Sequence, residues 1–307
     1  MPGTAAGDPP LAKRCRRPGN GMAIASLILS VLGIGLGPVL QIPGVCLGHG
    51  SLIKTRNLKT RPTGRKLAKA GMIIGYAGLA VWLAAGYLVA QEFARSASCV
   101  VNLGAQKTML LVYVAENGGM YPPVSPEPGR LMYSIEGREN LPGVYPEYMS
   151  DASACVCPTN SHKARGDTRA QFDDHSYYYL GYAMNTDEHA ELLAKAYLDA
   201  VQRGEPLEGD IDADPGAYSP LNRHLYRLRE RVEIEFMTEI FGPRGVMRGR
   251  VQAEIPVVIE RMGNHWRKGG HVLFLDGHIE FIKYPGKFPM TERTIAALES
   301  MDRAKAP

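Results

Sequence analysis

Residues 71–90 read GMIIGYAGLAVWLAAGYLVA, twenty consecutive residues without a formal charge. A helix of about 20 apolar residues spans the ~30 Å hydrocarbon core of a bilayer, so this stretch predicts a transmembrane helix. It also separates two parts of opposite charge, because residues 1–70 hold eleven Lys and Arg against Asp8 alone, while the rest holds 24 basic and 30 acidic residues. A basic, apolar first part favours contact with anionic lipid headgroups over contact with nucleic acid.

The residues before this stretch predict a tail and a first membrane segment. Residues 1–20 are rich in Pro, Gly and basic side chains, which predicts a disordered basic tail. Residues 22–53 hold no formal charge and would form a helix of about 48 Å, longer than the hydrocarbon core. A single span kinked at Pro38 and Pro43 is expected, with a re-entrant segment that turns back as the alternative. Residues 21–90 are therefore predicted to form an anchor of two transmembrane helices.

A basic loop at residues 54–69 joins the two predicted spans and carries seven Lys and Arg without an acid. The positive-inside rule places such a short loop in the cytoplasm. The domain that follows residue 90 is then expected on the other side of the membrane. The four basic residues of the tail oppose this orientation unless the first segment is re-entrant.

Residues 91–307 have the composition of a folded α+β domain. Helix-compatible residues continue after the membrane stretch as far as Asn117-Gly118-Gly119, a C-terminal stop signal, so one long helix is predicted. Its apolar stripe consists of Leu103, Leu110, Leu111 and Val114. A second helix is expected to begin with Asn185 as N-cap and to end at Gly204, and a last one to run from Glu292 to Met301, capped by Thr291.

The most specific local signal is GGHVLFLDGHIEFIKY at residues 269–284. Asp276-Gly277 between two β-rich runs predicts a β-hairpin with a two-residue type I′ turn. This register pairs Val272 with Phe281 and gives the hairpin one core-facing side and one half-polar side. The half-polar side consists of His271, His278 and Glu280 with Leu273, Leu275 and Ile282.

One set of side chains is a candidate for metal binding, because imidazole and carboxylate groups suit zinc and similar ions. The set consists of His265, His271, Asp276 and His278. A structural interpretation is preferred, in which Asp276 is chosen for the turn. No metal and no cofactor are therefore expected.

The cysteines of the second part are candidates for a disulfide or for catalysis. Cys99 with Cys157 is the pairing to test, and an oxidising compartment would favour it. A catalytic cysteine with His162 or His175 as its base is the enzyme alternative. Nothing in the sequence orients such a base, so catalysis is not expected.

Several phrases of the first part resemble a known bacterial family. They are GMAIASLILSVLG at 21–33, LGHGSL at 47–52 and GRKLAKAGMIIGY at 64–76. On these phrases, residues 21–90 resemble a bacterial two-helix membrane domain of unknown function. The resemblance implies a membrane anchor without a known chemistry.

The second part carries CVVNLGAQKTMLLVYVAENGGMYPP at 99–123, Cys157-Pro158, and NHWRKGGHVLFLDGHIEFIKYPGKFP at 264–289. On these motifs, residues 91–307 resemble the prepilin-type, processing-associated bacterial family, defined by a His, nine residues and Asp-Gly. Its motif residues are here His265, Asp276 and Gly277, with ten residues between His and Asp instead of nine. The family is similar to pseudopilins, in which a long N-terminal helix packs on an antiparallel sheet.

One departure concerns processing, since Tyr76 stands where the prepilin cleavage motif has Glu, five residues past Gly71. The two-helix anchor is therefore expected to replace the membrane segment of a pilin. Taken together, we expect an envelope-facing, pseudopilin-like structural or assembly protein of the bacterial inner membrane, with its C-terminal domain extracytoplasmic. Its expected partners are the lipid bilayer and itself or pilin-type and secretion-type envelope proteins. The alternative is a membrane-anchored binding module that recognises an envelope ligand or polymer through the hairpin face.

Overall fold

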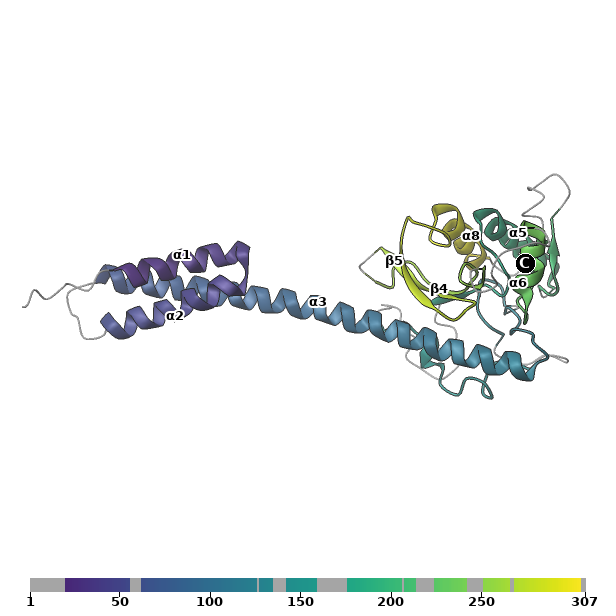
Figure 1. Ribbon diagram of the computed structural model, residues 1–307, viewed down its shortest axis with the longest axis horizontal. Coiled ribbons are helices and arrows are strands. Elements are labelled where there is room, and N and C mark those ends of the chain that lie inside the picture. Colours follow the sequence, from purple (N-terminus) through teal and green to yellow (C-terminus); the bar gives the residue numbers. More distant parts are fainter. Residues whose placement is uncertain are drawn as a thin grey trace, which may run out of the picture. The chain divides into compact units, whose positions relative to one another are not determined.

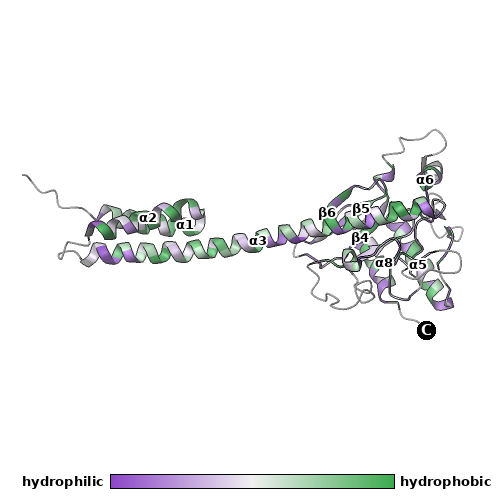
Figure 2. Ribbon diagram, turned by 90° about the horizontal axis from the view of Figure 1, so that it is seen from below, coloured by the Kyte–Doolittle hydropathy of each residue, from purple (hydrophilic) through white to green (hydrophobic). Residues whose placement is uncertain are grey.

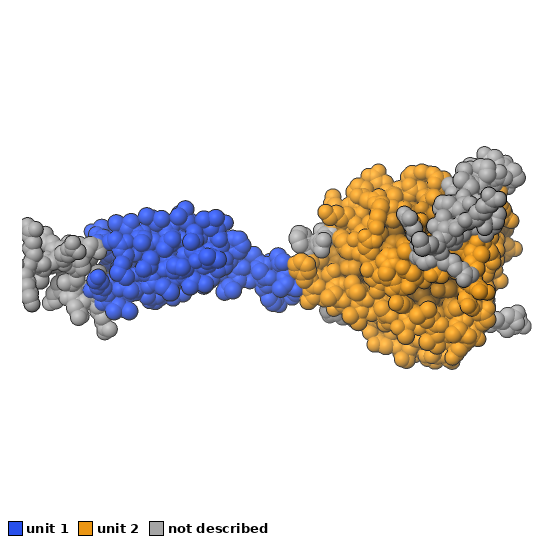
Figure 3. All heavy atoms as spheres, in the orientation of Figure 1, with its two compact units in different colours: residues 1–91 blue, residues 92–307 orange. Residues whose placement is uncertain are grey.

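The computed structural model describes residues 20–55, 62–125, 127–134, 142–158, 176–205, 207–213, 224–241, 251–265 and 268–304. The chain divides into two compact units, Met1–Gln91 and Glu92–Pro307, shown in two colours in Figure 3. Helix α3 (Pro62–Glu116) contributes residues to both units. Nearly all of the predicted tail, and residues 56–61 of the predicted basic loop, lie outside the described residues.

The first unit packs helices α1 (Gly21–Leu36) and α2 (Pro38–Thr55) against the first part of α3. Gly37, at a φ of 87°, ends α1, and Pro38 begins α2 at once, so the chain reverses within one residue. Small residues face each other along the contact, because a Cβ on Gly44 would touch Ser30 and a Cβ on Gly48 would touch Ser26. The glycines therefore allow the backbones of neighbouring helices to approach closely.

This reversal corrects the prediction of two transmembrane helices. At 1.5 Å per residue the 16 and 18 residues of α1 and α2 reach about 24 and 27 Å, short of the hydrocarbon core. Among the described residues, α3 is the one helix long and apolar enough to cross a membrane. Hydrophobic residues run along much of its length (Figure 2). The kinked single span predicted for residues 22–53 is wrong, because Gly37-Pro38 turns the chain back.

Glycine on α3 makes the close packing of the first unit testable. A Cβ on Gly71 would lie 2.7 Å from Ser26 Oγ and 2.9 Å from the backbone nitrogen of Leu27, whereas a Cβ on Gly35 would meet nothing within 4 Å. We expect Gly71→Ala to destabilise the unit by about 1–3 kcal/mol through overpacking. Gly35→Ala is the control and should be neutral or stabilising by up to ~1 kcal/mol. Thermal unfolding of the full chain in detergent measures both, and equal effects would contradict the packing described.

The second unit is an α+β domain, as the sequence predicts, built on a four-stranded antiparallel sheet in the order β1-β4-β5-β6. Strands β4 and β5 of this sheet are labelled in Figure 1. Its strands are β1 (Tyr177–Tyr179), β4 (Pro256–Glu260), β5 (Gly269–Phe274) and β6 (Ile279–Lys283). A second sheet pairs β2 (Ile211–Asp212) with β3 (His224–Leu225). The remaining described elements are η1 (Ala152–Cys155), α5 (Asp187–Arg203), α6 (Val232–Phe241) and α8 (Glu292–Asp302).

Helix α3 packs on this sheet through one side of its last part. The buried residues of that side are Glu92, Cys99, Leu103, Gln106, Met109, Leu110 and Tyr113. The predicted end is confirmed, because α3 stops at Glu116 and Gly118 and Gly119 both have positive φ. The predicted apolar stripe is wrong in one member: Leu110 is buried but Leu111 is 55% exposed. Successive residues of a helix point about 100° apart, so these two cannot share a narrow stripe.

The β5–β6 hairpin is confirmed, but its predicted register is wrong by one residue. His271 pairs with Phe281 and Val272 with Glu280. The turn spans three residues, because the backbone nitrogen of Phe274 donates to the carbonyl of His278 and that of Gly277 to the carbonyl of Phe274. Positive φ occurs at Gly277 but not at Asp276, so a type I turn with a bulged glycine replaces type I′. The shift moves His271 and His278 to opposite faces of the sheet.

The helix caps of the second unit follow local chemistry. The hydroxyl of Thr291 accepts a hydrogen bond from the backbone nitrogen of Thr294 at the start of α8, which confirms the predicted cap. At α5 the cap is Thr186, whose hydroxyl accepts from the backbone nitrogen of His189, one residue later than predicted. Gly204 ends α5 in the left-handed conformation, as predicted.

A candidate site of thiol, carboxylate and imidazole groups

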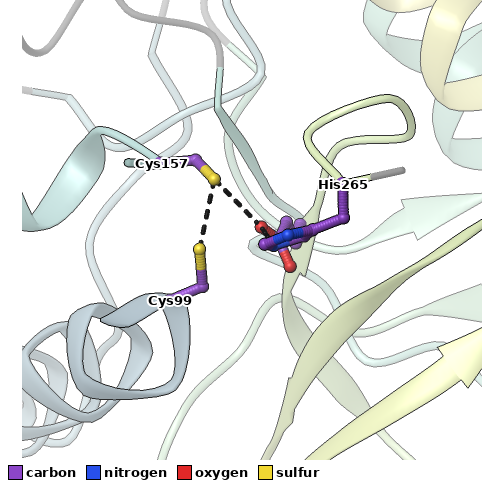
Figure 4. A group of neighbouring side chains, drawn as sticks. Cys99, Cys157 and His265 are labelled. Atoms are coloured by element: carbon purple, nitrogen blue, oxygen red, sulfur yellow. Dashed lines mark hydrogen bonds and ion pairs between the residues drawn. The ribbon is translucent and has the colours of Figure 1, made fainter. Parts of the chain in front are cut away.

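Four side chains converge in the interior of the second unit between α3 and the sheet. Cys99 comes from α3, Cys157 from the loop after η1, and His265 from the loop after β4, and all three point toward one another (Figure 4). Glu260, the last residue of β4, is the fourth. One ligand atom from each residue lies within 4.8 Å of the others, and all four residues are buried.

The carboxylate of Glu260 is the centre of the cluster. Its Oε1 accepts from Nε2 of His265 at 2.9 Å and from the Cys157 thiol at 3.3 Å. Its Oε2 accepts from the backbone nitrogen of His271 at 3.0 Å and lies 2.7 Å from Nδ1 of the same residue. A fully buried carboxylate requires such partners, because an unpaired charge in the interior costs several kcal/mol. These contacts hold both oxygens in fixed directions.

An outer layer of polar contacts orients the side chains around Glu260. Nδ1 of His265 lies 2.9 Å from a carboxylate oxygen of Glu92 on α3. Nε2 of His271 lies 3.2 Å from the hydroxyl of Ser96, also on α3. The backbone nitrogen of Cys157 donates to the hydroxyl of Ser176 at 2.9 Å. His265, His271 and Cys157 therefore each have a second contact that holds them from the side away from Glu260.

The electrostatics of the cluster favour a buried ion pair. Burial opposes the charged form of Glu260, but hydrogen bonds with His265 and His271 outweigh it and hold the pKa of Glu260 well below its usual range. Burial likewise opposes the imidazolium of His265, but hydrogen bonds with Cys157 and Glu260 raise its pKa to about 10. The hydrogen bond with Cys157, together with burial and Glu260, raises the pKa of the Cys99 thiol. A nucleophilic cysteine needs a lowered pKa and access to solvent, so this thiol is unsuited to catalysis.

The four residues that the sequence suggested as metal ligands lie at two separate places in the structure. His265 and His271 lie together, with ring centroids 5.7 Å apart, and both contact Glu260. Asp276 and His278 form a separate pair at the tip of the β5–β6 hairpin, where a carboxylate oxygen of Asp276 accepts from the backbone nitrogen of His278 at 3.0 Å. The motif residue Gly277 is held there too, since its carbonyl accepts from Nζ of Lys107 on α3 at 3.1 Å.

The two cysteines proposed as a disulfide are neighbours in space. Their sulfur atoms lie 3.1 Å apart, beyond the ~2.05 Å of a disulfide bond, so the two residues are not joined covalently. The disulfide therefore stays a prediction that the distance makes feasible. His162 and His175, the bases of the enzyme alternative, lie outside the described residues.

Two acidic residues of the site were not singled out in the sequence. Glu260 ends the apolar strand EIPVVIE, and Glu92 stands two residues after the twenty-residue apolar stretch. A carboxylate directly beside an apolar stretch of sequence indicates that a polar partner lies in the protein interior, because Glu is almost never fully buried unless it is paired. The partner itself, His265, follows five residues after Glu260 and could have been sought there.

Comparison with known proteins informs the first unit only. The model of a domain of unknown function, DUF4190, matches residues 22–85. No curated protein and no solved structure matches the chain. The match supports a membrane-type N-terminal domain of unknown function in the region where the sequence resembles one. The pilin resemblance of residues 91–307 rests on its sequence motifs alone.

The buried carboxylate should contribute strongly to the stability of the second unit. Glu260→Ala removes the acceptor for His265, His271 and Cys157 in the interior, so we expect a loss of about 3–5 kcal/mol. Glu280→Ala on β6 is the control, because Glu280 forms a partly exposed ion pair with Lys287 and should cost no more than ~1 kcal/mol. Denaturant unfolding of the full chain in detergent, followed by near-ultraviolet circular dichroism, compares the two. Similar losses would show that Glu260 is not the centre described.

Proposed function

We propose that this chain is a membrane-anchored, envelope-facing structural or assembly protein, related to pseudopilins, whose copies associate through α3. The observation that carries this proposal is an uncharged stripe along the exposed side of α3. Its members repeat at intervals of three or four residues and are Phe93, Ala97, Val100, Gly104, Thr108 and Leu111, with Val101 and Val112 beside them. Such a spacing presents one continuous seam to another helix.

The stripe lies on the side of α3 that the second unit leaves uncovered. Phe93 is 64% exposed and Val101 is 70% exposed, whereas Cys99, Leu103 and the other core-facing residues are buried. Large apolar side chains gathered in one exposed line mark an interaction surface more often than isolated ones do. A Cβ on Gly104 would meet nothing within 4 Å, so a second helix can approach the backbone there.

A second copy of this chain is the partner that best fits the stripe. The apolar stretch at residues 71–90 belongs to the same helix and would anchor every copy in one membrane. Confinement to a membrane raises the effective concentration of copies for one another without any new contact. Lateral packing of like helices is also the arrangement that the pseudopilin resemblance implies.

A charge placed in the stripe tests the proposal. We expect Val101→Glu to weaken self-association of the full chain in lipid nanodiscs or detergent at least tenfold, because burying an unpaired carboxylate costs more than the ~1.4 kcal/mol that a tenfold change represents. Gln202→Glu is the matched control, since it adds the same charge at an exposed position of α5. Interchain cross-linking and analytical ultracentrifugation measure the association. A chain that stays monomeric at all concentrations, or a variant that associates like the control, would refute lateral assembly.

The proposed orientation has its own test. The basic residues around 54–69 favour a cytoplasmic loop and an extracytoplasmic second unit, in the inner membrane of a bacterium. A reporter that is active only outside the cytoplasm, fused after Pro307, should be active, while a cytoplasm-only reporter at the same place should be silent. The reverse pattern would place the second unit in the cytoplasm and remove the envelope-facing part of the proposal.

The binding-module alternative has less support. It relied on a hairpin face that carries His271, His278 and Glu280 together, and the observed register separates His271 from the other two. His271 turns toward Glu260 and Ser96, so it is unavailable to an external ligand. No catalytic role is proposed.

A further inference from the structure

We propose that Cys99, Cys157, Glu260 and His265 form a structural zinc site. The four residues offer two sulfurs, one imidazole nitrogen and one carboxylate oxygen, all within 4.8 Å of one another. Zinc is the common ion that accepts this mixture, because it binds thiolate, imidazole and carboxylate in a tetrahedron. Neither the stripe of α3 nor self-association enters this inference.

The closest pairs of ligand atoms lie slightly nearer to each other than the corresponding atoms of a zinc tetrahedron. With zinc bonds of about 2.3 Å to sulfur and 2.0–2.1 Å to nitrogen and oxygen, the edges of the tetrahedron are about 3.8 Å between sulfurs and about 3.3 Å between nitrogen and oxygen. The corresponding distances are 3.1 Å between the sulfurs and 2.9 Å between Nε2 of His265 and Oε1 of Glu260. These two pairs would open by about 0.7 and 0.4 Å on binding zinc, and the other pairs, all within 4.8 Å, would adjust toward the ~3.6 Å edge between sulfur and nitrogen or oxygen.

The contacts around the cluster already aim the ligand atoms inward. Metal-binding histidines almost always pair their second ring nitrogen with a carboxylate or carbonyl, and Nδ1 of His265 lies 2.9 Å from Glu92. Ligating carboxylates are themselves hydrogen-bonded, and Oε2 of Glu260 contacts His271 twice while Oε1 faces the thiols. A disulfide would use only the two sulfurs and would require none of this support. The arrangement therefore points to a metal rather than to a disulfide.

Four protein ligands in a buried place describe a closed site, which is the structural rather than the catalytic type. The ligands come from α3, from the loop after η1, and from β4 with the loop that follows it, so one ion would hold together three segments that are remote in sequence. Zinc binds the deprotonated forms, so both thiols and Nε2 of His265 release their protons to solvent on binding. The two thiolates and Glu260 then offset the charge of the ion.

Metal titration of the reduced full chain in detergent tests the proposal, with Zn²⁺ and Co²⁺ as probes. We expect one ion per chain and, with Co²⁺, a thiolate charge-transfer band together with the visible bands of tetrahedral cobalt. Cys99→Ser and Cys157→Ser should each weaken binding more than 100-fold and remove or halve the charge-transfer band. Cys155→Ser and Cys46→Ser are the controls and should bind like the parent, because Cys155 is buried beside Met149 outside the cluster and Cys46 is exposed.

A variant that keeps all four ligands separates metal binding from folding. Glu92→Gln removes the carboxylate behind His265 and should weaken affinity about 10–100-fold with an unchanged cobalt spectrum. Near-ultraviolet circular dichroism before metal addition identifies any variant that has lost its fold. If a cysteine variant is misfolded, the metal affinity of Glu92→Gln is the result that tests the proposal.

Three results would overturn the inference. The first is a reduced, folded chain that gives no cobalt–thiolate band. The second is equal binding by the parent and by folded Cys99→Ser and Cys157→Ser, which would place the ion elsewhere. The third is chain isolated from cells without zinc and with Cys99 and Cys157 joined as a disulfide, which would show that oxidation and not metal closes the cluster.

Discussion

The second unit depends on how a carboxylate is satisfied in its interior. Glu260 is fully buried at the end of β4, and each of its oxygens has partners: His265 and Cys157 on one, His271 on the other. The partners of such a group have to be held in place, because a buried charge that loses a partner destabilises the fold by more free energy than the intact pair contributes. The loop after β4, the strand β5 and the loop after η1 therefore have to meet at one place. Glu92 and Cys99 bring α3 to the same place.

In the first unit, small residues rather than buried polar partners determine how the helices pack. Along α1, α2 and α3, contacts between glycine and serine let backbones approach, and the hydroxyl of Ser26 donates to the carbonyl of Gly44 at 2.7 Å. Close packing and buried hydrogen bonds of this kind stabilise apolar helices even where surrounding lipid removes most of the hydrophobic effect between them. The glycines of the first unit thus have a geometric role, because they allow these close approaches.

Features that depend on neighbouring residues in the sequence were predicted correctly, whereas features that depend on residues far apart in the sequence were not. The start of α8 at Thr291 and the end of α3 before Gly118 depend on a few adjacent residues and were predicted. The β5–β6 register depends on whether one or two turn residues take positive φ, and Asp276-Gly277 is compatible with both turn types, so the one-residue shift was invisible. The site was predicted only in pieces, because Cys99, Cys157 and His265 are 58 and 108 positions apart along the chain and only the folded sheet unites them with Glu260.

The cluster and the exposed stripe are related through the geometry of one helix. Glu92 and Cys99 are seven residues apart, nearly two turns, so they define one side of α3, and that side is fixed against the sheet by their contacts with His265 and Cys157. Fixing one side of a helix also fixes the direction of the opposite one. Phe93 and Val101 therefore point away from the sheet because Glu92 and Cys99 point toward it, and the polar interior of the second unit determines which apolar surface α3 offers outside.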